Sequence, residues 1–261
     1  MKGMDTEVSW WEYARTYDQL CEVNHHYQKL IEHYREWLVA HSKLHNTASI
    51  CDIGAGTGNF VLTTADVLPS SELHHFDWNS EMTSIAERKY EKRGLNVEIH
   101  KESVERLPSL GNSFDLIIMI NALYSFKNPK KVLEDCRHKL KPGGYIYVVD
   151  TGRPIQTHRF SADILSKVYK SRGLLGTLSL YRQLLPAVKA NRQIEKTASN
   201  GEYWRHSTKE FEEAFNEAGF TIAHSETCYR GIADRVIGQR EFDEPMLTTW
   251  EARLDQSLAP N

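Results

Sequence analysis

The middle of the chain alternates short apolar runs with longer segments in which apolar residues recur at helical spacing. Short runs with β-branched residues predict strands, and a spacing of three or four residues predicts helices. The run at 113–121 is apolar on both faces and predicts a central parallel strand. Other strands are predicted at 50–53, 73–76, 96–100 and 145–149, and an antiparallel pair at 221–228 and 234–239.

Two further regions have helical patterns of their own. Residues 8–44 are rich in aromatic side chains at helical spacing, which predicts a lid or flank packed on the domain. Residues 153–199 carry a long helical pattern with nine Lys and Arg against two Asp and Glu, a net charge of +7. Plain solvation explains this basic character as well as the two alternatives together, which are an anionic substrate and a membrane surface.

A glycine-rich turn at 48–60 follows the first predicted strand. Gly54, Gly56 and Gly58 alternate, and Asp52 lies at the end of the strand. Such a turn lets a ligand approach bare backbone and places its anionic group at a helix N-terminus. A dinucleotide fingerprint does not fit, because asparagine follows Gly58 where a third glycine is required, and no Gly-Lys-Ser/Thr of a Walker loop is present.

Polar side chains follow the second and fourth predicted strands. Asp77 ends the second strand, at the position where an acid can accept hydrogen bonds from both hydroxyls of a ribose. Trp78 beside it can cover an adenine face, and Met82 follows in the next helix. Asn121 and Tyr124 come after the central strand, so we expect them to border cofactor and substrate at the carboxyl ends of the strands.

The composition is that of an ordinary globular protein, with 40% hydrophobic and 26% charged residues. The formal net charge of -3 argues against a general nucleic-acid binder. The four cysteines lack C-x-x-C spacing, which favours a reduced, intracellular protein. No apolar run approaches the ~20 residues of a membrane span, and the N-terminus lacks the pattern of a signal peptide. We therefore expect a cytoplasmic protein.

The order Asp-x-Gly-x-Gly-x-Gly at 52–58 resembles motif I of the class I S-adenosylmethionine-dependent methyltransferases of the type 11 and type 25 kind. Leu-Lys-Pro-Gly-Gly at 140–144 and Tyr-Ala…Tyr-Asp at 13–18 are similar to further segments of this family. The resemblance covers residues 13–150 and 201–240. It implies an α/β, Rossmann-like fold: a seven-stranded, mostly parallel sheet with an antiparallel last strand, helices on both faces and a helical cap insertion.

The resemblance and the helical patterns together predict the domain organisation. We expect an N-terminal helical lid at 1–46 and a cofactor-binding domain formed by 47–152 and 200–240. In this family an insertion after the fifth strand typically covers the substrate site, so 153–199 is predicted to be a substrate cap. The tail at 241–261 is predicted to form a short helix and a frayed end.

The resemblance also implies the cofactor, S-adenosylmethionine, with S-adenosylhomocysteine as the product and no metal. Tyr17 would close over the cofactor, and Asp52 would lie near its methionine end. The acid at the place of Glu102 would accept from the adenine amino group, and the backbone amide that follows would donate to the ring. The implied cofactor-binding residues are Tyr17, Asp52, Gly54, Ala55, Gly56, Gly58, Asp77, Trp78, Met82, Glu102, Ser103, Val104 and Asn121.

Methyl transfer is an in-line displacement in which the protein mainly aligns donor and acceptor in a site closed to water. An amine acceptor needs no dedicated base, whereas a hydroxyl or carbon acceptor generally requires proton removal. Candidates for proton transfer or for orienting the acceptor are Tyr17, Tyr124, His158, Arg205 and His206.

The first interpretation is methylation of an N or O atom of a small-molecule acceptor, an anionic one included. A lipid or prenylated quinone is the alternative among enzymes, with the basic cap contacting a membrane. A non-catalytic cofactor-binding or interaction protein is the alternative from another class. Methylation of a nucleic-acid base is disfavoured, because Ala122 and Leu123 stand where such enzymes carry two prolines. The aromatic N-terminal helix could also be the interface of a homodimer.

Overall fold

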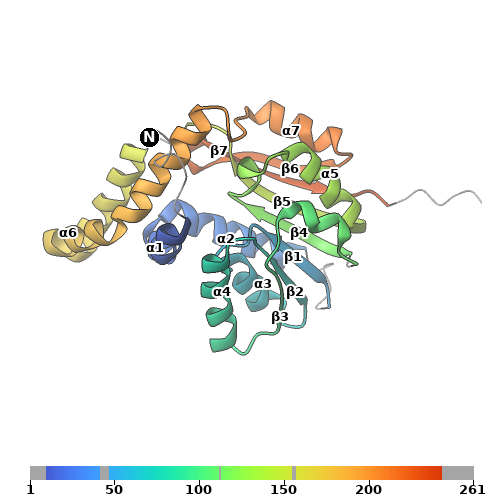
Figure 1. Cartoon of the computed structure of the whole chain (residues 1–261), viewed down its shortest axis with the longest axis horizontal. Helices are drawn as coiled ribbons and strands as arrows, with labels where there is room; N and C mark the ends of the chain where they lie inside the picture. Colours follow the sequence, from blue (N-terminus) through green and yellow to red (C-terminus); the bar gives the residue numbers. More distant parts are fainter. Residues whose placement is uncertain (1–9, 42–46, 112, 155–156, 243–261) are drawn as a thin grey trace, which may run out of the picture.

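The computed structural model describes residues 10–41, 47–111, 113–154 and 157–242, without the side chains of 10–12 and 157–160. Seven strands form one sheet in the order β3-β2-β1-β4-β5-β7-β6 (Figure 1). Parallel pairing joins β3 through β5, and β7 runs antiparallel to both of its neighbours. The predicted Rossmann-like fold is therefore confirmed. The strands are β1 Ser49–Ile53, β2 Glu72–Phe76, β3 Val97–His100, β4 Phe114–Ile120, β5 Leu140–Thr151, β6 Thr221–Cys228 and β7 Ala233–Gln239.

Helices cover both faces of the sheet, and two buried clusters occupy the two interfaces. In β4 alternate residues enter different clusters: Leu116 and Ile118 pack with α3 and α4, whereas Ile117 and Met119 pack with α5 and α7. This explains why the fourth strand is apolar on both faces. The helices here are α3 Asn59–Val67, α4 Ser80–Lys92, α5 Pro129–Lys139 and α7 Thr208–Glu217, with short 3-10 helices at Val104–Ser109, Leu123–Ser125 and Tyr229–Gly231.

The N-terminal helical region is two helices, α1 Trp10–Val23 and α2 His25–Ala40. Asn24 separates them, because its side chain accepts hydrogen bonds from the backbone amides of His26 and Tyr27 and so begins a new helix. The helical pattern of 8–44 alone does not reveal this break. Residues 8, 9 and 42–44 lie outside the described part.

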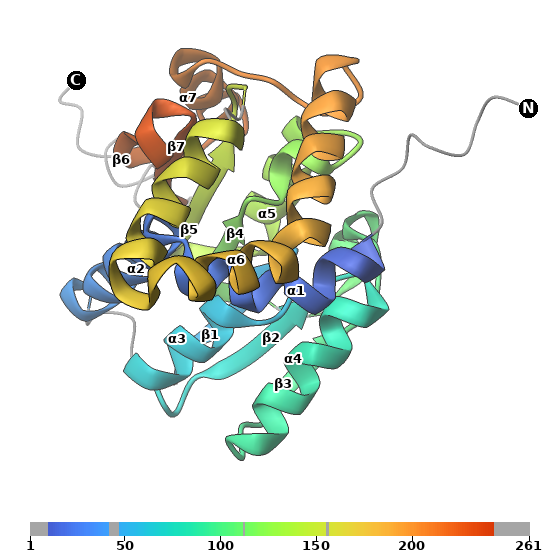
Figure 2. The same cartoon turned by 90° about the vertical axis from the view of Figure 1, so that its left-hand side faces the viewer.

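The insertion forms α6, Thr157–Ser199, which is broken at Gly173. Gly173 has φ 67° and ψ -172°, a conformation that essentially only glycine adopts. Ile164 and Val168 before the break pack against Leu180 and Leu184 after it, so α6 is a helical hairpin. Figure 2 shows its two arms over α1, and in Figure 1 the hairpin projects from the body of the molecule. No described helix combines the length and apolar character needed to cross a membrane.

The Leu-Lys-Pro-Gly-Gly segment interrupts the pairing of β5 with β4. Phe114 is paired with Leu140 and Leu116 with Tyr145, so residues 141–144 loop out of register. Gly143 supplies the positive φ of 80° that this loop needs. Regular pairing resumes at Tyr145, where the sequence predicts the strand to begin. Of the predicted tail, 243–261 lies outside the described residues.

Candidate active site

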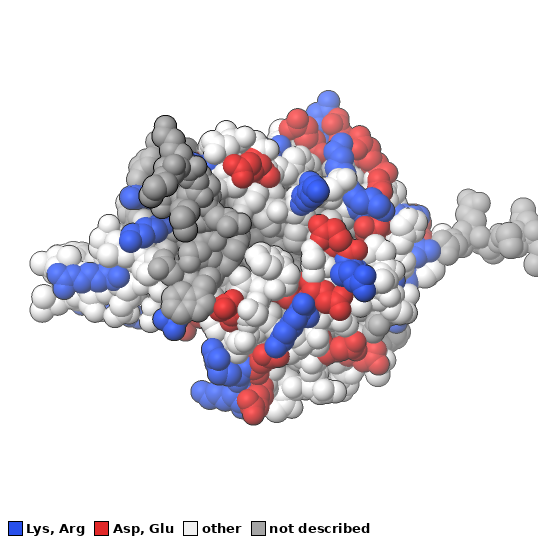
Figure 3. All heavy atoms as spheres, in the orientation of Figure 1, with Lys and Arg blue, Asp and Glu red and all other residues white. Residues whose placement is uncertain are grey.

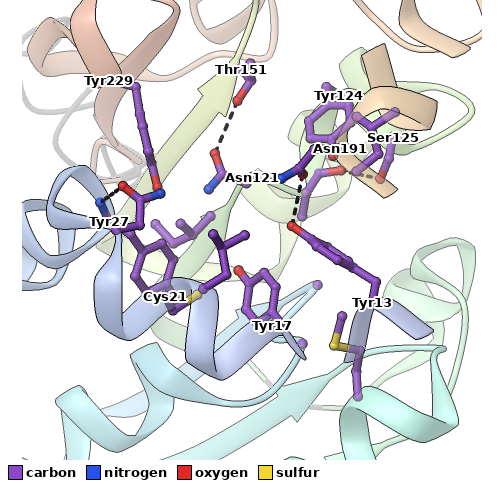
Figure 4. Close-up of a pocket in the computed structure, with 18 of the residues that line it drawn as sticks. Tyr13, Tyr17, Cys21, Tyr27, Asn121, Tyr124, Ser125, Thr151, Asn191 and Tyr229 are labelled. Carbon is purple, nitrogen blue, oxygen red and sulfur yellow. Dashed lines mark hydrogen bonds between the residues drawn. The ribbon is translucent and has the colours of Figure 1, made fainter. Parts of the chain in front are cut away.

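One pocket of about 240 Å³ lies where the carboxyl ends of β1, β2 and β4 meet α1 and α6 (Figure 4). Its floor comes from the residues that follow the strands, and its roof comes from the two helical regions. Carboxyl ends of parallel strands are where such sheets bind ligands, so the position agrees with the fold. The floor is formed by Gly54, Gly56, Asp77, Trp78, Asn79, Asn121 and Ala122, and the roof by Tyr13, Tyr17, Cys21, Ile164, Val188, Asn191 and Ile194.

The Asp77 carboxylate is held by two backbone amides at the edge of this pocket. Its Oδ2 accepts a hydrogen bond of 2.8 Å from the Gly56 amide, and its Oδ1 accepts one of 2.8 Å from the Asn79 amide. Burial raises the pKa of Asp77, and these two donors oppose that shift. The glycine turn and the end of β2 are thereby joined through one side chain that keeps further lone pairs for a ligand.

The glycine turn has two kinds of glycine. Gly54 and Gly56 line the pocket with φ values of 68° and 56°, and a Cβ on Gly56 would meet nothing closer than the Gly54 carbonyl oxygen at 4.0 Å. Gly58 does not line it; this residue begins α3, and a Cβ there would collide with the Tyr90 ring. The open space over Gly56 can therefore admit a ligand, whereas Gly58 is required by packing.

Asp52 and Ala55 stand behind the pocket and are not part of its lining. The Asp52 side chain is only 3% exposed, and burial, followed by the charge of Asp77, raises its pKa well above the ordinary value. Ala55 packs against the core on the α3 side of the sheet. Both support the turn from below.

A polar network that the sequence does not predict ties α1 to the glycine turn. Asp18 Oδ1 accepts hydrogen bonds from Thr57 Oγ1 at 2.6 Å and from Asn59 Nδ2 at 3.3 Å. Lys89 Nζ, from α4, lies 3.1 Å from Asp18 Oδ2 and donates to Asn59 Oδ1 at 2.7 Å. Asn59, the residue that breaks the dinucleotide fingerprint, thus bridges a lid helix and a domain helix. The available signal was Asp18 in the Tyr-Asp pair.

Asn121 and Tyr124 follow β4 and border the pocket on the other side of the turn. Asn121 has a positive φ of 53°, which asparagine tolerates better than most residues. Its Oδ1 accepts a hydrogen bond of 3.3 Å from Thr151 Oγ1 at the end of β5 (Figure 4). A side-chain carbonyl and amide therefore border the pocket between its floor and its roof.

The roof is mainly aromatic and apolar. Tyr13 and Tyr17 form an edge-to-face pair with ring centroids 5.2 Å apart, and Tyr13 OH donates to Asn191 Oδ1 of α6 at 3.2 Å (Figure 4). Burial raises the pKa of both tyrosines, and it raises the pKa of the Cys21 thiol to about 12. These groups stay protonated near neutral pH, so they suit hydrogen-bond donation and packing better than proton removal.

Trp78 and Met82 lie at the far end of the floor, with Trp78 59% exposed and Met82 buried. The three residues of the predicted adenine loop are outside the pocket lining. Glu102 is exposed and pairs with Arg106, Ser103 is hydrogen-bonded to Glu105, and Val104 belongs to the core on the α5 side.

Two further predicted residues lie outside the pocket lining. Arg205 Nη2 pairs with Glu195 Oε1 of α6 at 2.6 Å, which joins the cap to the chain that follows it. His206 is buried and stacked on Phe211, with ring centroids 4.3 Å apart. The side chain of His158, at the start of α6, lies outside the described residues.

Lining residues that the sequence does not single out come mostly from α1 and α6. Cys21 and Asn24 follow Tyr13 and Tyr17 at steps of three or four residues, so one face of α1 lines the pocket. The spacing predicts a helix, but it does not distinguish residues that line a pocket from residues that pack in the core. The contribution of α6, Asn191 above all, has no local signal.

Residues 50–144 match a family model described as a methyltransferase domain. A demethylmenaquinone methyltransferase of Chlorobaculum parvum is 25% identical over 225 residues, covering 81% of this chain and 83% of that protein. A ubiquinone/menaquinone biosynthesis C-methyltransferase of Pasteurella multocida is 31% identical over 123 residues, covering 46% of this chain and 44% of that protein.

Solved structures share the fold at low sequence identity. The magnesium protoporphyrin IX methyltransferase of Synechocystis PCC 6803, determined with bound S-adenosylmethionine, has a TM-score of 0.58 at 12% identity, and the match covers 92% of this chain and 100% of that one. An O-methyltransferase family protein of Burkholderia thailandensis has a TM-score of 0.57 at 15% identity, and the match covers 87% of this chain and 59% of that one.

Proposed function

Because the chain belongs to the class I S-adenosylmethionine-dependent methyltransferases, we propose that its acceptor is a lipid-soluble, quinol-like small molecule bound between α1, α6 and the strand ends. The observation that carries the proposal is the lining of the pocket. It combines a polar floor around Asp77 with an aromatic and apolar roof, and its described residues include no Lys, Arg or His. Among these described residues an anionic acceptor would find no side chain of opposite charge.

The floor fits the cofactor. Gly54 and Gly56 expose backbone to the pocket, and the open space over Gly56 is bordered by the Asp77 carboxylate, a suitable acceptor for ribose hydroxyls. Bound there, S-adenosylmethionine supplies an electrophilic methyl group on a sulfonium. Asp77 and the glycine backbone hold the donor side, while Asn121 and Tyr124 border the space where the acceptor would lie.

The acceptor side favours a group that ionises easily by itself. The tyrosines of the roof have raised pKa values because they are buried, so they donate hydrogen bonds rather than take a proton. A quinol or phenol loses its proton more readily than an alcohol, and it needs no strong base from the protein. The roof then contributes by excluding water and aligning the ring with the methyl donor.

Relatives and the surface of α6 support a lipid-soluble acceptor over the N- or O-methylated small molecule of the first interpretation. The relatives named above are a demethylmenaquinone and a ubiquinone/menaquinone methyltransferase. At the break in α6, Leu174 and Leu175 are 62% and 83% exposed. The projecting end carries exposed Lys170, Arg172 and Arg182. In Figure 3 the part of the molecule that projects to the left shows Lys and Arg side chains among uncharged residues. Exposed leucines flanked by cations suit the surface of an anionic bilayer.

Methyl transfer to matched acceptors tests the proposal. The protein is incubated with S-adenosylmethionine and a reduced quinol carrying a prenyl tail, the same ring without the tail, or the same ring with a carboxylate in its place. Mass spectrometry should find the methylated prenyl quinol, with a kcat/KM at least about ten-fold above that of the carboxylate. Preferred turnover of the carboxylate, or none of any quinol by protein that binds the cofactor, would reject it.

Co-sedimentation with anionic vesicles tests the contact of α6 with a bilayer separately. We expect Leu174→Ser with Leu175→Ser, or Arg172→Ala with Arg182→Ala, to release the protein from the vesicles. The matched control is Val39→Ser, which alters an apolar residue of α2 that is 64% exposed. Equal release by the control would show that the tip is not the contact.

A further inference from the structure

We propose that His74, Glu98 and His100 form a binding site for a divalent transition-metal ion, best matched by zinc, at the β2–β3 edge of the sheet. The cluster is separate from the pocket, because none of the three residues is in its lining. It does not depend on methyl transfer. Imidazole and carboxylate are the ligands that zinc uses together with water when it has three protein ligands.

The strand register brings the three side chains to one face. β2 and β3 are parallel, with His74 paired to Glu98 and Phe76 paired to His100. Side chains two residues apart on a strand share a face, so Glu98 and His100 both lie beside His74. The next residue, His75, points the other way and contacts Tyr90 of α4. The cluster therefore lies on the face of the sheet opposite α4.

The possible ligand atoms have the mutual distances that a metal requires. His74 Nδ1 lies 3.4 Å from His100 Nε2 and 3.5 Å from Glu98 Oε2, and His100 Nε2 lies 3.4 Å from Glu98 Oε1. Ligands about 2.0–2.1 Å from a tetrahedral zinc are about 3.3–3.4 Å from one another. The two ring nitrogens thus have the spacing of two corners of such a tetrahedron. Glu98 presents a different oxygen to each ring, and one oxygen that lies within 4.8 Å of both nitrogens can supply a third corner. Glu98 is 57% exposed, so the fourth corner faces solvent, where water can complete it.

Neighbouring groups already orient both rings. His74 Nε2 lies 3.3 Å from Ser49 Oγ, so a proton on that nitrogen has an acceptor and Nδ1 keeps its lone pair toward the cluster. The His74 ring packs edge-on against Phe114, and the His100 ring stacks on Phe76, with centroid distances of 5.1 and 5.6 Å.

A simple hydrogen-bonded trio is the competing explanation. In it one imidazole is charged and the carboxylate accepts from both rings. The ring nitrogens lie 3.5 and 3.4 Å from the carboxylate oxygens, farther than the roughly 2.7–2.9 Å of charge-assisted hydrogen bonds, whereas the 3.4 Å between the two nitrogens suits two ligands of one ion. A bound ion would tie the edge strand β3 to β2, three residues before Asp77, and would stabilise the folded chain by mass action.

Titration of chelator-treated, cofactor-free protein with Zn²⁺ and Co²⁺ tests the site. Calorimetry should give one ion per chain with a Kd of micromolar order or tighter, and Co²⁺ should develop the visible absorption of tetrahedral coordination. Glu98→Gln and His100→Gln should each weaken binding by on the order of 100-fold. At saturating Zn²⁺ the wild-type Tm should rise by several degrees, and the rise should vanish in both variants.

The matched control is His224→Gln. His224 Nε2 lies 3.4 Å from Glu226 Oε2, so this is also a histidine beside a glutamate. The control should bind Zn²⁺ as the wild type does. Binding that survives Glu98→Gln and His100→Gln, or a wild type that binds no ion below about 100 µM, would overturn the proposal. Because Glu98 is exposed and Gln has the same shape, a failure to fold is not expected to obscure the result.

Discussion

The floor and the roof of the pocket are built in different ways. In the floor, the Asp77 carboxylate accepts hydrogen bonds from the backbone amides of Gly56 and Asn79. These contacts join residues that are close in the sequence and lie at the ends of neighbouring strands. Roof residues are held by side chains that meet over long distances, as Tyr13 and Asn191 do across 178 positions. The floor depends on a backbone geometry that few residue types can adopt. The roof depends on side-chain packing, which many combinations of residues could achieve.

This difference suggests a division of labour. Under the proposed function the floor holds a cofactor that the whole family shares and can stay constant, whereas the roof meets an acceptor that differs between enzymes and must be adaptable. The two parts are joined by the Asp18 network, which spans α1, the glycine turn and α4. Substitutions in the floor, the junction and the roof should therefore separate cofactor binding from acceptor binding.

The largest effect is expected at the floor. Asp77→Ala removes the carboxylate that would accept from the ribose and leaves two backbone amides without their acceptor. Affinity for S-adenosylmethionine should fall on the order of 100-fold, measured by calorimetric titration. Glu72→Ala is the control, because Glu72 is an exposed acid at the other end of the same strand. Similar losses in both variants would contradict a specific role for Asp77.

A smaller loss of cofactor affinity is expected when the Asp18 network, which joins the floor to the roof, is broken. Asp18→Ala breaks the contacts of α1 with Thr57, Asn59 and Lys89. With the lid helix released, affinity for S-adenosylmethionine should fall by about ten-fold, and amide exchange in α1 should increase. Glu22→Ala, an exposed acid on the next turn of α1, should leave both quantities unchanged. Faster exchange without weaker binding would separate the lid from cofactor affinity.

The roof should affect the acceptor alone. Tyr13→Phe removes the hydroxyl that donates to Asn191 and keeps the ring. We expect KM for the acceptor to rise by about five-fold, the equivalent of one neutral hydrogen bond, with the Kd for S-adenosylmethionine unchanged. Steady-state kinetics and calorimetry measure the two quantities. Tyr169→Phe, on an exposed tyrosine of α6, is the control. A parallel change in cofactor affinity would show that Tyr13 belongs to the floor.

A separate effect, on folding stability and not on binding, concerns the pH dependence of Asp52 beneath the floor. Burial raises the folded-state pKa of Asp52 above its ordinary value of about 4, so the folded chain binds this proton more tightly than the unfolded chain. The free energy of unfolding should therefore fall as the pH rises from the ordinary pKa of an aspartate toward the raised pKa of Asp52 in the folded chain. Asp52→Asn should remove up to about 1.4 kcal/mol per pH unit of this slope, measured by urea unfolding between pH 4 and 8.

Asp66→Asn is the control of opposite sign. Burial acts to raise the pKa of Asp66, but its contacts with Arg93 and Arg35 outweigh burial and lower it. Loss of this group should remove stability that is present above pH 4 and disappears on acidification. An Asp52→Asn profile parallel to that of the wild type would mean that Asp52 does not titrate differently on folding.

The features that could be predicted from the sequence are those carried by local backbone requirements. The glycine turn, the strands on either side of it and Asp77 follow from glycine spacing and from an acid at a strand end. The split at Asn24 also has a local cause, an N-cap asparagine inside a helical run, and a closer reading of that position would have found it.

Features created by tertiary contacts have no comparable signal. Asn191 reaches the pocket only because α6 folds back at Gly173 and packs on α1. The loop at Glu102, predicted to contact adenine, lies outside the pocket lining, with the side chain of Glu102 exposed and that of Val104 in the core. His74 and His100 are 26 residues apart and are brought together by strand register, which the pattern of either strand does not specify.

The pairing of β5 with β7 has a consequence for how this molecule can change. Thr151 and Ala233 are direct partners, so the segment between them, which holds α6, α7 and the edge strand β6, begins and ends at neighbouring positions of the sheet. The entropy of closing a loop grows only with the logarithm of its length, about 0.6 kcal/mol for each doubling. Residues can therefore be gained or lost in α6 at small cost to folding, and the range of acceptors can diverge over generations while the sheet stays as it is.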